Sequence, residues 1–151
     1  MKAVIQRVTR AKVTVDGKIT GEIEKGFLVL LGVMDGDTES EMKLLAKKVS
    51  EIRIFEDENG KMNLSLSQVG GSVLVVSQFT LCADLSHGRR PSFIKSAPVD
   101  IANSLYEAFC TELQNLGTQN VQKGIFGADM AVELVNDGPV TIIMNTDEWK
   151  K

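Results

Sequence analysis

The chain has 151 residues, of which 43% are apolar and 25% charged, which is ordinary for a globular protein and indicates a single domain, residues 1–151. Its 17 basic and 20 acidic residues give a formal net charge of −3, which excludes a strongly cationic nucleic-acid binder and leaves room only for a local basic patch. No apolar run is long enough to span a membrane, and two cysteines are too few for a disulfide framework, so we expect a cytoplasmic protein.

The N-terminal part of the sequence predicts a β-hairpin followed by a central strand. Residues 2–15 and 19–23 alternate in polarity on either side of Asp16-Gly17, a pair suited to a tight two-residue turn. Residues 27–31 are apolar on both faces, which is typical of a strand covered on both sides.

A helix is predicted next, because Thr38 and Glu41 have the spacing of a capping box. Apolar residues then recur every three or four positions and predict a buried face of Met42, Leu45, Val49 and Ile52. Three lysines, Lys43, Lys47 and Lys48, lie largely on the opposite face, which we interpret as exposed to solvent.

The second half of the chain predicts another buried strand at 72–76, which continues into the polar residues 77–80. A helix follows Pro98 and ends near Gly117, with Ile101, Leu105, Phe109 and Leu113 at helical spacing. Two further strands, 131–135 and 140–144, flank residues 136–139. These elements predict an α/β domain with two principal helices packed on a strongly twisted, barrel-like sheet.

The only histidine, His87, limits the chemistry that side chains can perform. Any Ser-His or Cys-His mechanism has to use it as the base, yet it lies in a polar Gly/Pro-containing segment typical of an exposed loop. A zinc site needs several His or Cys ligands, so we expect no metal. Ser77 and Thr80 stand where a buried strand ends, and main-chain N–H groups at such a position can stabilise an oxyanion without an ionisable side chain.

Two further features have two interpretations each. Arg89 and Arg90 can hold phosphates or be simply solvated. Asn136-Asp137-Gly138-Pro139 reads either as a plain hairpin turn or as a functional segment whose Gly-Pro bond can be cis. The two cysteines, Cys82 and Cys110, are expected in the core, and Phe126 and Met130 in core or loop packing.

Two segments resemble the signature motifs of the D-aminoacyl-tRNA deacylases, also called D-tyrosyl-tRNA deacylases. They are Ser77-Gln78-Phe79-Thr80-Leu81 and Asn136-Asp137-Gly138-Pro139-Val140-Thr141. The resemblance extends over the whole chain, because 4–8, 90–93 and 126–130 also resemble family segments in the family's order. The loop around His87 departs from the form expected for the family.

The resemblance implies a homodimer without cofactors that hydrolyses the ester between a D-amino acid and the terminal ribose of tRNA. It implies a reaction pocket at Ser77, Gln78, Phe79 and Thr80 that receives the 3′ terminal adenosine and the aminoacyl group. It also implies that Gly138-Pro139, in cis, enters the partner subunit's pocket, with Arg7 as a brace. Phe126 and Met130 are expected to bind substrate, and Arg89 and Arg90 to bind tRNA; no DNA or membrane partner is expected.

A main-chain filter of this kind rejects an L-amino acid by occupying the space that its side chain needs. Glycine has no side chain, so we expect slow action on glycyl-tRNA as well. Since the chain offers no good base, the substrate's own ribose hydroxyl is our hypothesis for water activation. The rival hypotheses are a non-catalytic binding module and an ordinary serine or threonine esterase that uses His87.

Overall fold

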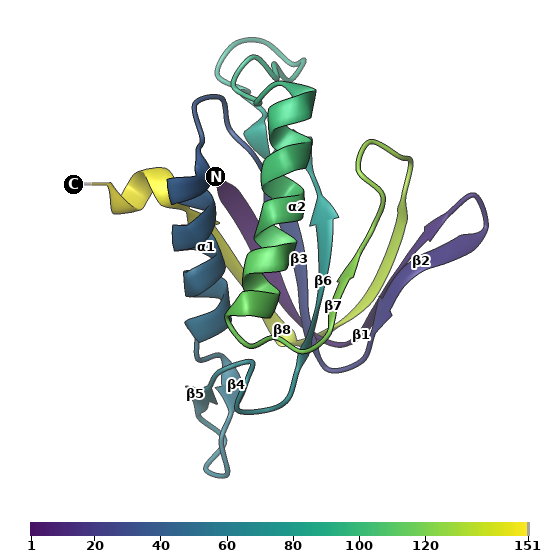
Figure 1. The fold of residues 1–151 in the computed structure, drawn as a ribbon, viewed down its shortest axis with the longest axis vertical. Helices are drawn as coiled ribbons and strands as arrows, with labels where there is room; N and C mark the ends of the chain where they lie inside the picture. Colours follow the sequence, from purple (N-terminus) through teal and green to yellow (C-terminus); the bar gives the residue numbers. More distant parts are fainter. Residues whose placement is uncertain (151) are drawn as a thin grey trace.

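A six-stranded sheet forms the centre of the structure, a computed structural model that describes residues 1–150 (Figure 1). Its strands are β1 (Lys2–Val15), β2 (Lys18–Ile23), β3 (Gly26–Gly32), β6 (Ser72–Ser77), β7 (Val121–Lys123) and β8 (Ala131–Asn145). Strand order is β2-β1-β3-β6-β7, and β8 pairs with the other edge of β1. The β3–β6 and β6–β7 pairs are parallel, and those of β1 are antiparallel.

The sheet curls because the long strand β1 changes partner along its length. Its first half, residues 2–8, pairs with β3, and residues 11–15 pair with β2, while β8 follows β1 from end to end on the other side. A strand that serves two neighbours in succession on one edge must bend, and the sheet bends with it. The result is the twisted, barrel-like sheet that the sequence predicts.

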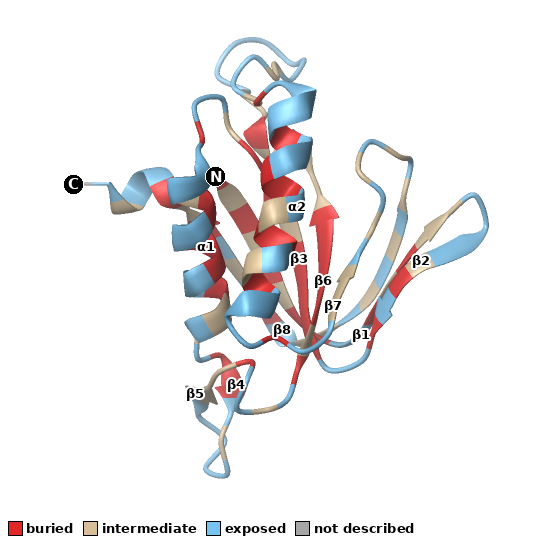
Figure 2. Ribbon diagram, in the orientation of Figure 1, coloured by how far each residue is buried: buried red, intermediate tan, exposed pale blue. Residues whose placement is uncertain are grey.

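Helices α1 (Glu39–Glu51) and α2 (Val99–Asn115) contact each other and lie side by side over the sheet (Figure 1). The smaller elements are β4 (Phe55–Glu56), β5 (Met62–Leu64) and the 3₁₀ helices η1 (Phe79–Cys82) and η2 (Thr146–Trp149). Buried residues concentrate on β3, β6 and the helix sides that face them (Figure 2). A second apolar cluster, which includes Val8, Leu28 and Leu74, lies on the other side of the sheet.

The start of α1 confirms the predicted capping box. Glu41 accepts hydrogen bonds from the backbone N–H and the hydroxyl of Thr38, at 2.7 and 2.6 Å. These donors favour the charged carboxylate, so the pKa of Glu41 falls to about 2. Its contribution to stability is therefore complete above the ordinary carboxyl pKa and is lost as the pH falls toward 2.

Most predicted elements are confirmed, including the hairpin at Asp16-Gly17, the buried strands β3 and β6, and both helices. The buried face of α2 differs from the prediction at Ile101, which is 44% exposed, whereas Ala102 and Tyr106 are buried. Ile52 is half-buried and ends α1 rather than extending its buried face. The strands β4, β5 and β7 are two or three residues long and leave too little pattern to read.

The prediction of two separate strands around residues 136–139 is wrong. Residues 131–145 form the single strand β8, both halves of which run in the same direction along β1. Asn136 pairs opposite Val8 and Thr141 opposite Gln6, so one residue of β1, Arg7, faces the four residues 137–140. The segment is a bulge within a continuous strand and not a hairpin turn.

No helix within residues 1–150 combines the length and apolar character needed to cross a membrane.

Candidate active site

The end of strand β6 carries the segment that the sequence singled out. Ser77 is the last residue of β6, and the Gln78 N–H donates to the carbonyl of Leu31 on β3 at 2.8 Å. The chain then turns into η1, where Leu81 N–H donates to the Gln78 carbonyl at 3.2 Å. Among residues 1–150, no acceptor is present for the N–H groups of Phe79 and Thr80. Two adjacent amides that are free of partners can stabilise negative charge on a substrate oxygen.

A cavity of about 660 Å³ opens beside this segment. It lies between the end of β6, the first turn of α2 and the connection from β7 to β8. Its lining comprises Val76, Ser77, Gln78, Phe79, Phe93, Ser96, Ala97, Pro98, Val99, Ala102, Phe126, Gly127, Ala128, Asp129, Met130 and Val132. The lining is mainly apolar with a few polar groups, and the volume suits a nucleoside-sized ligand.

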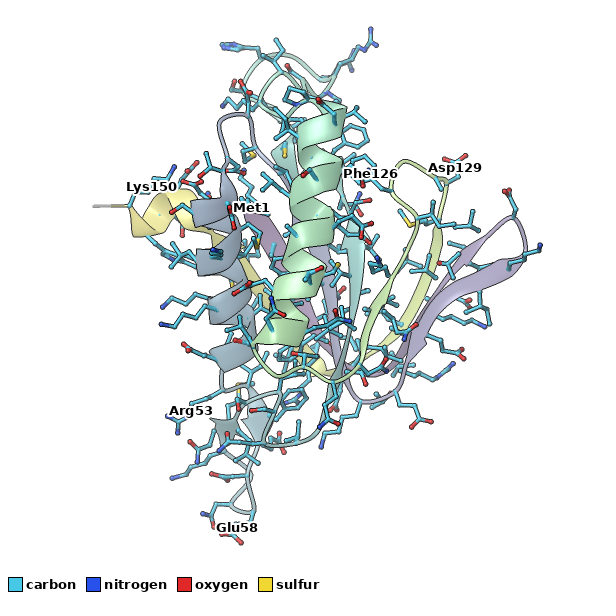
Figure 3. All side chains as sticks on the ribbon, in the orientation of Figure 1. Met1, Arg53, Glu58, Phe126, Asp129 and Lys150 are labelled. Carbon is cyan, nitrogen blue, oxygen red and sulfur yellow. The ribbon has the colours of Figure 1, made fainter. Side chains whose placement is uncertain are left out.

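Figure 3 labels two residues of the β7–β8 connection that borders the cavity, Phe126 on the side near α2 and Asp129 at its tip. Phe126 and Met130, for which the sequence alone indicated packing, are both half-buried and line the cavity. Asp129 is the one charged residue in the lining. The pocket thus brings together Ser77, Gln78, Phe79, Phe126 and Met130, whereas Thr80, the next residue of η1, is not part of its lining.

Two aromatic rings form part of the cavity wall. Phe79 is 58% exposed, an unusual state for a phenylalanine, and its ring meets that of Phe93 edge to face with centroids 4.9 Å apart. An exposed aromatic face gives a nucleic-acid base a surface on which to stack.

The peptide bond between Gly138 and Pro139 is cis, and both residues are exposed on the β8 bulge. Asn136 closes the bulge: its Oδ1 accepts from Val140 N–H at 2.8 Å, and its Nδ2 donates to Thr141 Oγ1 at 3.0 Å. Gly138 has φ +142°, and a Cβ there would lie 2.7 Å from the Val140 side chain. Position 138 therefore requires glycine.

Arg7 holds the same bulge from the β1 side and is only 5% exposed. Its Nε donates to the Asp137 carbonyl at 3.0 Å and its Nη1 to the Ile54 carbonyl at 2.7 Å. The carboxylates of Asp137 and Glu56 lie 3.4 and 3.9 Å away. One guanidinium thus links the bulge to the chain segment after α1. The Glu56 and Ile54 contacts carry no sequence signal, because both residues are far from Arg7 in the chain.

The bulge and the cavity lie apart within one chain. Val132 lines the cavity, and Gly138 is six residues further along the same strand. At about 3.3 Å per residue, this places the bulge roughly 20 Å from the cavity. Neither Gly138, Pro139 nor Arg7 belongs to the cavity lining.

The basic residues lie on the loop between η1 and α2. His87, Arg89 and Arg90 are all exposed, and none forms an ion pair within residues 1–150. Asp84 and Ser92 exchange backbone hydrogen bonds of 2.8 and 3.0 Å at the base of the loop. Donors from Ser86, then Lys95, lower the pKa of Asp84 to about 2. The structure shows no hydrogen bond from His87 to Ser77 or Thr80, as a serine or threonine esterase would need.

Comparison with known proteins agrees with this architecture. A family model described as D-Tyr-tRNA(Tyr) deacylase matches residues 4–145. A D-aminoacyl-tRNA deacylase of Anaeromyxobacter dehalogenans (strain 2CP-C) is 56% identical over 146 residues, 97% of each chain. One of Thermus aquaticus is 54% identical over 148 residues, 98% of this chain and 97% of the relative.

Two solved structures share the fold. One, described as c-Myc DNA Unwinding Element Binding Protein, has a TM-score of 0.91 and 41% identity, covering 96% of this chain and 98% of that one. The other, from a structural analysis of a probable eukaryotic D-amino acid tRNA deacylase, has a TM-score of 0.81, 16% identity and coverage of 95% and 97%. At that identity the second match shows the fold alone.

The curated relatives define the class as hydrolases that remove an acyl group. With a family match over residues 4–145 and relatives above half identity over nearly the full chain, the protein belongs to the D-Tyr-tRNA(Tyr) deacylase family. This confirms the resemblance seen in the sequence motifs.

Replacing Arg7 by lysine tests the brace. A lysine keeps the charge, but its single ammonium group cannot donate to the carbonyls of Ile54 and Asp137 at once, as the planar guanidinium does. We therefore expect the free energy of unfolding to fall by about 2 kcal/mol. Amide exchange of Val140 should quicken. Urea unfolding and hydrogen exchange measure the two effects, with Arg10→Lys on the exposed face of β1 as the control. Equal stability of the two variants would contradict the role of Arg7.

Proposed function

We propose that the protein hydrolyses the ester bond between a D-amino acid and the terminal ribose of tRNA, releasing both in the cytoplasm. The observation that carries this proposal is the cavity at the end of β6, where a segment with free main-chain amides, the exposed ring of Phe79 and mainly apolar walls meet. Family membership supplies the substrate class, since the curated relatives are D-aminoacyl-tRNA deacylases.

The terminal adenosine binds against the aromatic wall of the cavity in this proposal. Phe79 exposes more than half of its surface beside Phe93, and stacking on an aromatic ring contributes about 1–3 kcal/mol per base. The scissile ester then lies near the N–H groups of Phe79 and Thr80. These amides are positioned before the reaction, so they stabilise the oxyanion of the tetrahedral intermediate without reorganising.

Water attack needs a group that accepts a proton from the water, and the substrate supplies it. His87 lies on an exposed loop and forms no hydrogen bond with the hydroxyl of Ser77 or Thr80. The free ribose hydroxyl next to the ester accepts a proton from the attacking water as it gives its own proton to the leaving ribose oxygen, and its position beside the ester makes this relay effective. The protein contributes positioning and charge stabilisation, and no cofactor is needed.

Gly138-Pro139 reads the stereochemistry of the substrate in the pocket of a partner subunit. Two observations support action between subunits: the bulge is exposed, and it lies roughly 20 Å from the cavity of its own chain. Ile143, on the same strand, is 77% exposed, as expected of a face that a second copy covers. We therefore propose a homodimer whose two active sites lie at the subunit interface.

The filter works by exclusion. Arg7 and Asn136 hold the bulge on both sides, so its main-chain atoms cannot move away from a side chain of the L configuration. A D side chain points elsewhere and is accepted, and glycine has nothing to exclude. Glycyl-tRNA is therefore a slow substrate.

The exposed arginines of the loop bind the tRNA backbone. Arg89 and Arg90 have no acidic partner within the described chain and are free to contact phosphates. Because the chain as a whole is acidic, such local contacts carry the electrostatic part of tRNA binding.

Incubation with matched D- and L-tyrosyl-tRNA tests the function and its filter together. We expect the D ester alone to be hydrolysed by the unchanged protein, and Pro139→Ala to raise L hydrolysis by at least ~10-fold while D hydrolysis persists. Pro91→Ala, at an exposed proline outside β8, is the matched control. Hydrolysis of both esters by the unchanged protein would indicate a general esterase, and hydrolysis of neither a binding module.

Thr80→Ala and His87→Ala separate main-chain catalysis from a hydroxyl nucleophile. Loss of a general base or nucleophile costs roughly 10²- to 10⁴-fold in rate. We expect both variants to keep most of their D-tyrosyl-tRNA deacylase activity in single-turnover assays. Abolished activity in a folded variant would show that the side chain itself performs the chemistry.

The double variant Arg89→Ala, Arg90→Ala should bind tRNA more weakly. Its affinity should also depend less on salt, because each lost phosphate contact lowers the slope of log K against log salt by about 1. Filter binding at several salt concentrations measures both quantities. Lys47→Ala, on the exposed face of α1, serves as the control, and an unchanged slope would show that the arginines are merely solvated.

A further inference from the structure

Tyr106 joins α2 to the sheet at the point where the cavity begins. Its side chain is 1% exposed, and its hydroxyl donates to the Val75 carbonyl at 2.8 Å. The same carbonyl accepts the N–H of Gly124 at 3.2 Å. Val75 pairs with Lys123 at the end of the β6–β7 ladder. The Val75 carbonyl therefore accepts hydrogen bonds from α2 and from the segment that follows β7.

The cavity opens directly beyond this junction. Past Val75, strand β6 contributes Val76 and Ser77 to one wall, and past Lys123 the chain forms the opposite wall from Phe126 onward. The Tyr106 ring lies 6.0 Å from that of Phe126, and Ala102, one turn earlier on α2, lines the third wall. Tyr106, itself on α2, therefore contacts the other two structural elements that enclose the pocket.

The hydroxyl is what distinguishes Tyr106 from its neighbours on the buried face of α2. Leu105, Phe109 and Leu113 fill the core with hydrocarbon alone. Burying a hydroxyl costs free energy unless it is hydrogen-bonded, and phenylalanine would fill the same space without that cost. Burial also raises the pKa of Tyr106 above its ordinary value, which keeps the group a hydrogen-bond donor.

We propose that Tyr106 is a positioning residue of the deacylation site. Its bond to Val75 fixes the end of β6, with the Phe79 and Thr80 amides that follow, relative to α2 and the Phe126 wall. This inference rests on the proposed function, since the positioned groups are those that stabilise the transition state. A displacement of about 1 Å at such groups is enough to cost up to 10²-fold in rate.

The test compares Tyr106→Phe with Phe109→Leu, a change to a fully buried residue one turn further along the same helix face. For Tyr106→Phe we expect kcat for D-tyrosyl-tRNA to fall at least ~10-fold, with KM within about twofold, because the lost contacts act in the transition state. Phe109→Leu should leave kcat unchanged at a temperature where both variants are folded.

Hydrogen exchange of residues 76–83 gives a readout that does not depend on activity. Exchange in this segment should quicken in Tyr106→Phe and stay unchanged in Phe109→Leu. Equal kcat values with unchanged exchange would overturn the proposal, as would an equal loss of kcat in both variants. If the unchanged protein does not hydrolyse D-tyrosyl-tRNA, the proposed function fails, and the exchange comparison alone decides whether Tyr106 positions the β6 end.

Discussion

The pairing of β8 with β1 is interrupted at one place, where four residues of β8 face Arg7 alone. Everything distinctive about the Gly138-Pro139 segment depends on this mismatch. The surplus backbone has to leave the plane of the sheet, and the buried guanidinium of Arg7 together with the side chain of Asn136 fixes where it goes. A loop at the end of a hairpin would be free to move, whereas a bulge in the middle of a long strand is held from both directions.

A rigid bulge can select a substrate only by touching it, and the cavity of the same chain is too distant from the bulge for this. The same strand starts at the wall of the cavity and reaches the bulge six residues later, so the fold separates the two parts of the site by construction. Two copies of the chain bring them together if each inserts its bulge into the other's pocket. In the proposed function, stereochemical selection by main-chain atoms depends on this arrangement.

The sequence predicts the elements whose signals are local. Asp16-Gly17 specifies its turn, Thr38 and Glu41 specify a helix start, and the apolar strands β3 and β6 can be read directly. The cavity segment at Ser77 also emerges, because a buried strand turns polar there.

What the sequence does not reveal depends on contacts between distant segments. The continuous strand β8 looks like two strands because its bulge has the composition of a turn, and only pairing with β1 shows otherwise. Likewise, nothing near Tyr106 indicates that its hydroxyl meets Val75, or near Arg7 that it meets Ile54. Long-range partners of this kind depend on tertiary packing and leave no periodic pattern.

A crystal structure with a non-hydrolysable amide analogue of D-tyrosyl-adenosine tests the central claim most directly. We expect the adenine against Phe79, the carbonyl oxygen near the Phe79 and Thr80 amides, and Pro139 of the partner subunit in contact with the chiral centre. An analogue bound in this cavity with no Gly138-Pro139 segment near its chiral carbon would show that handedness is not read by the bulge.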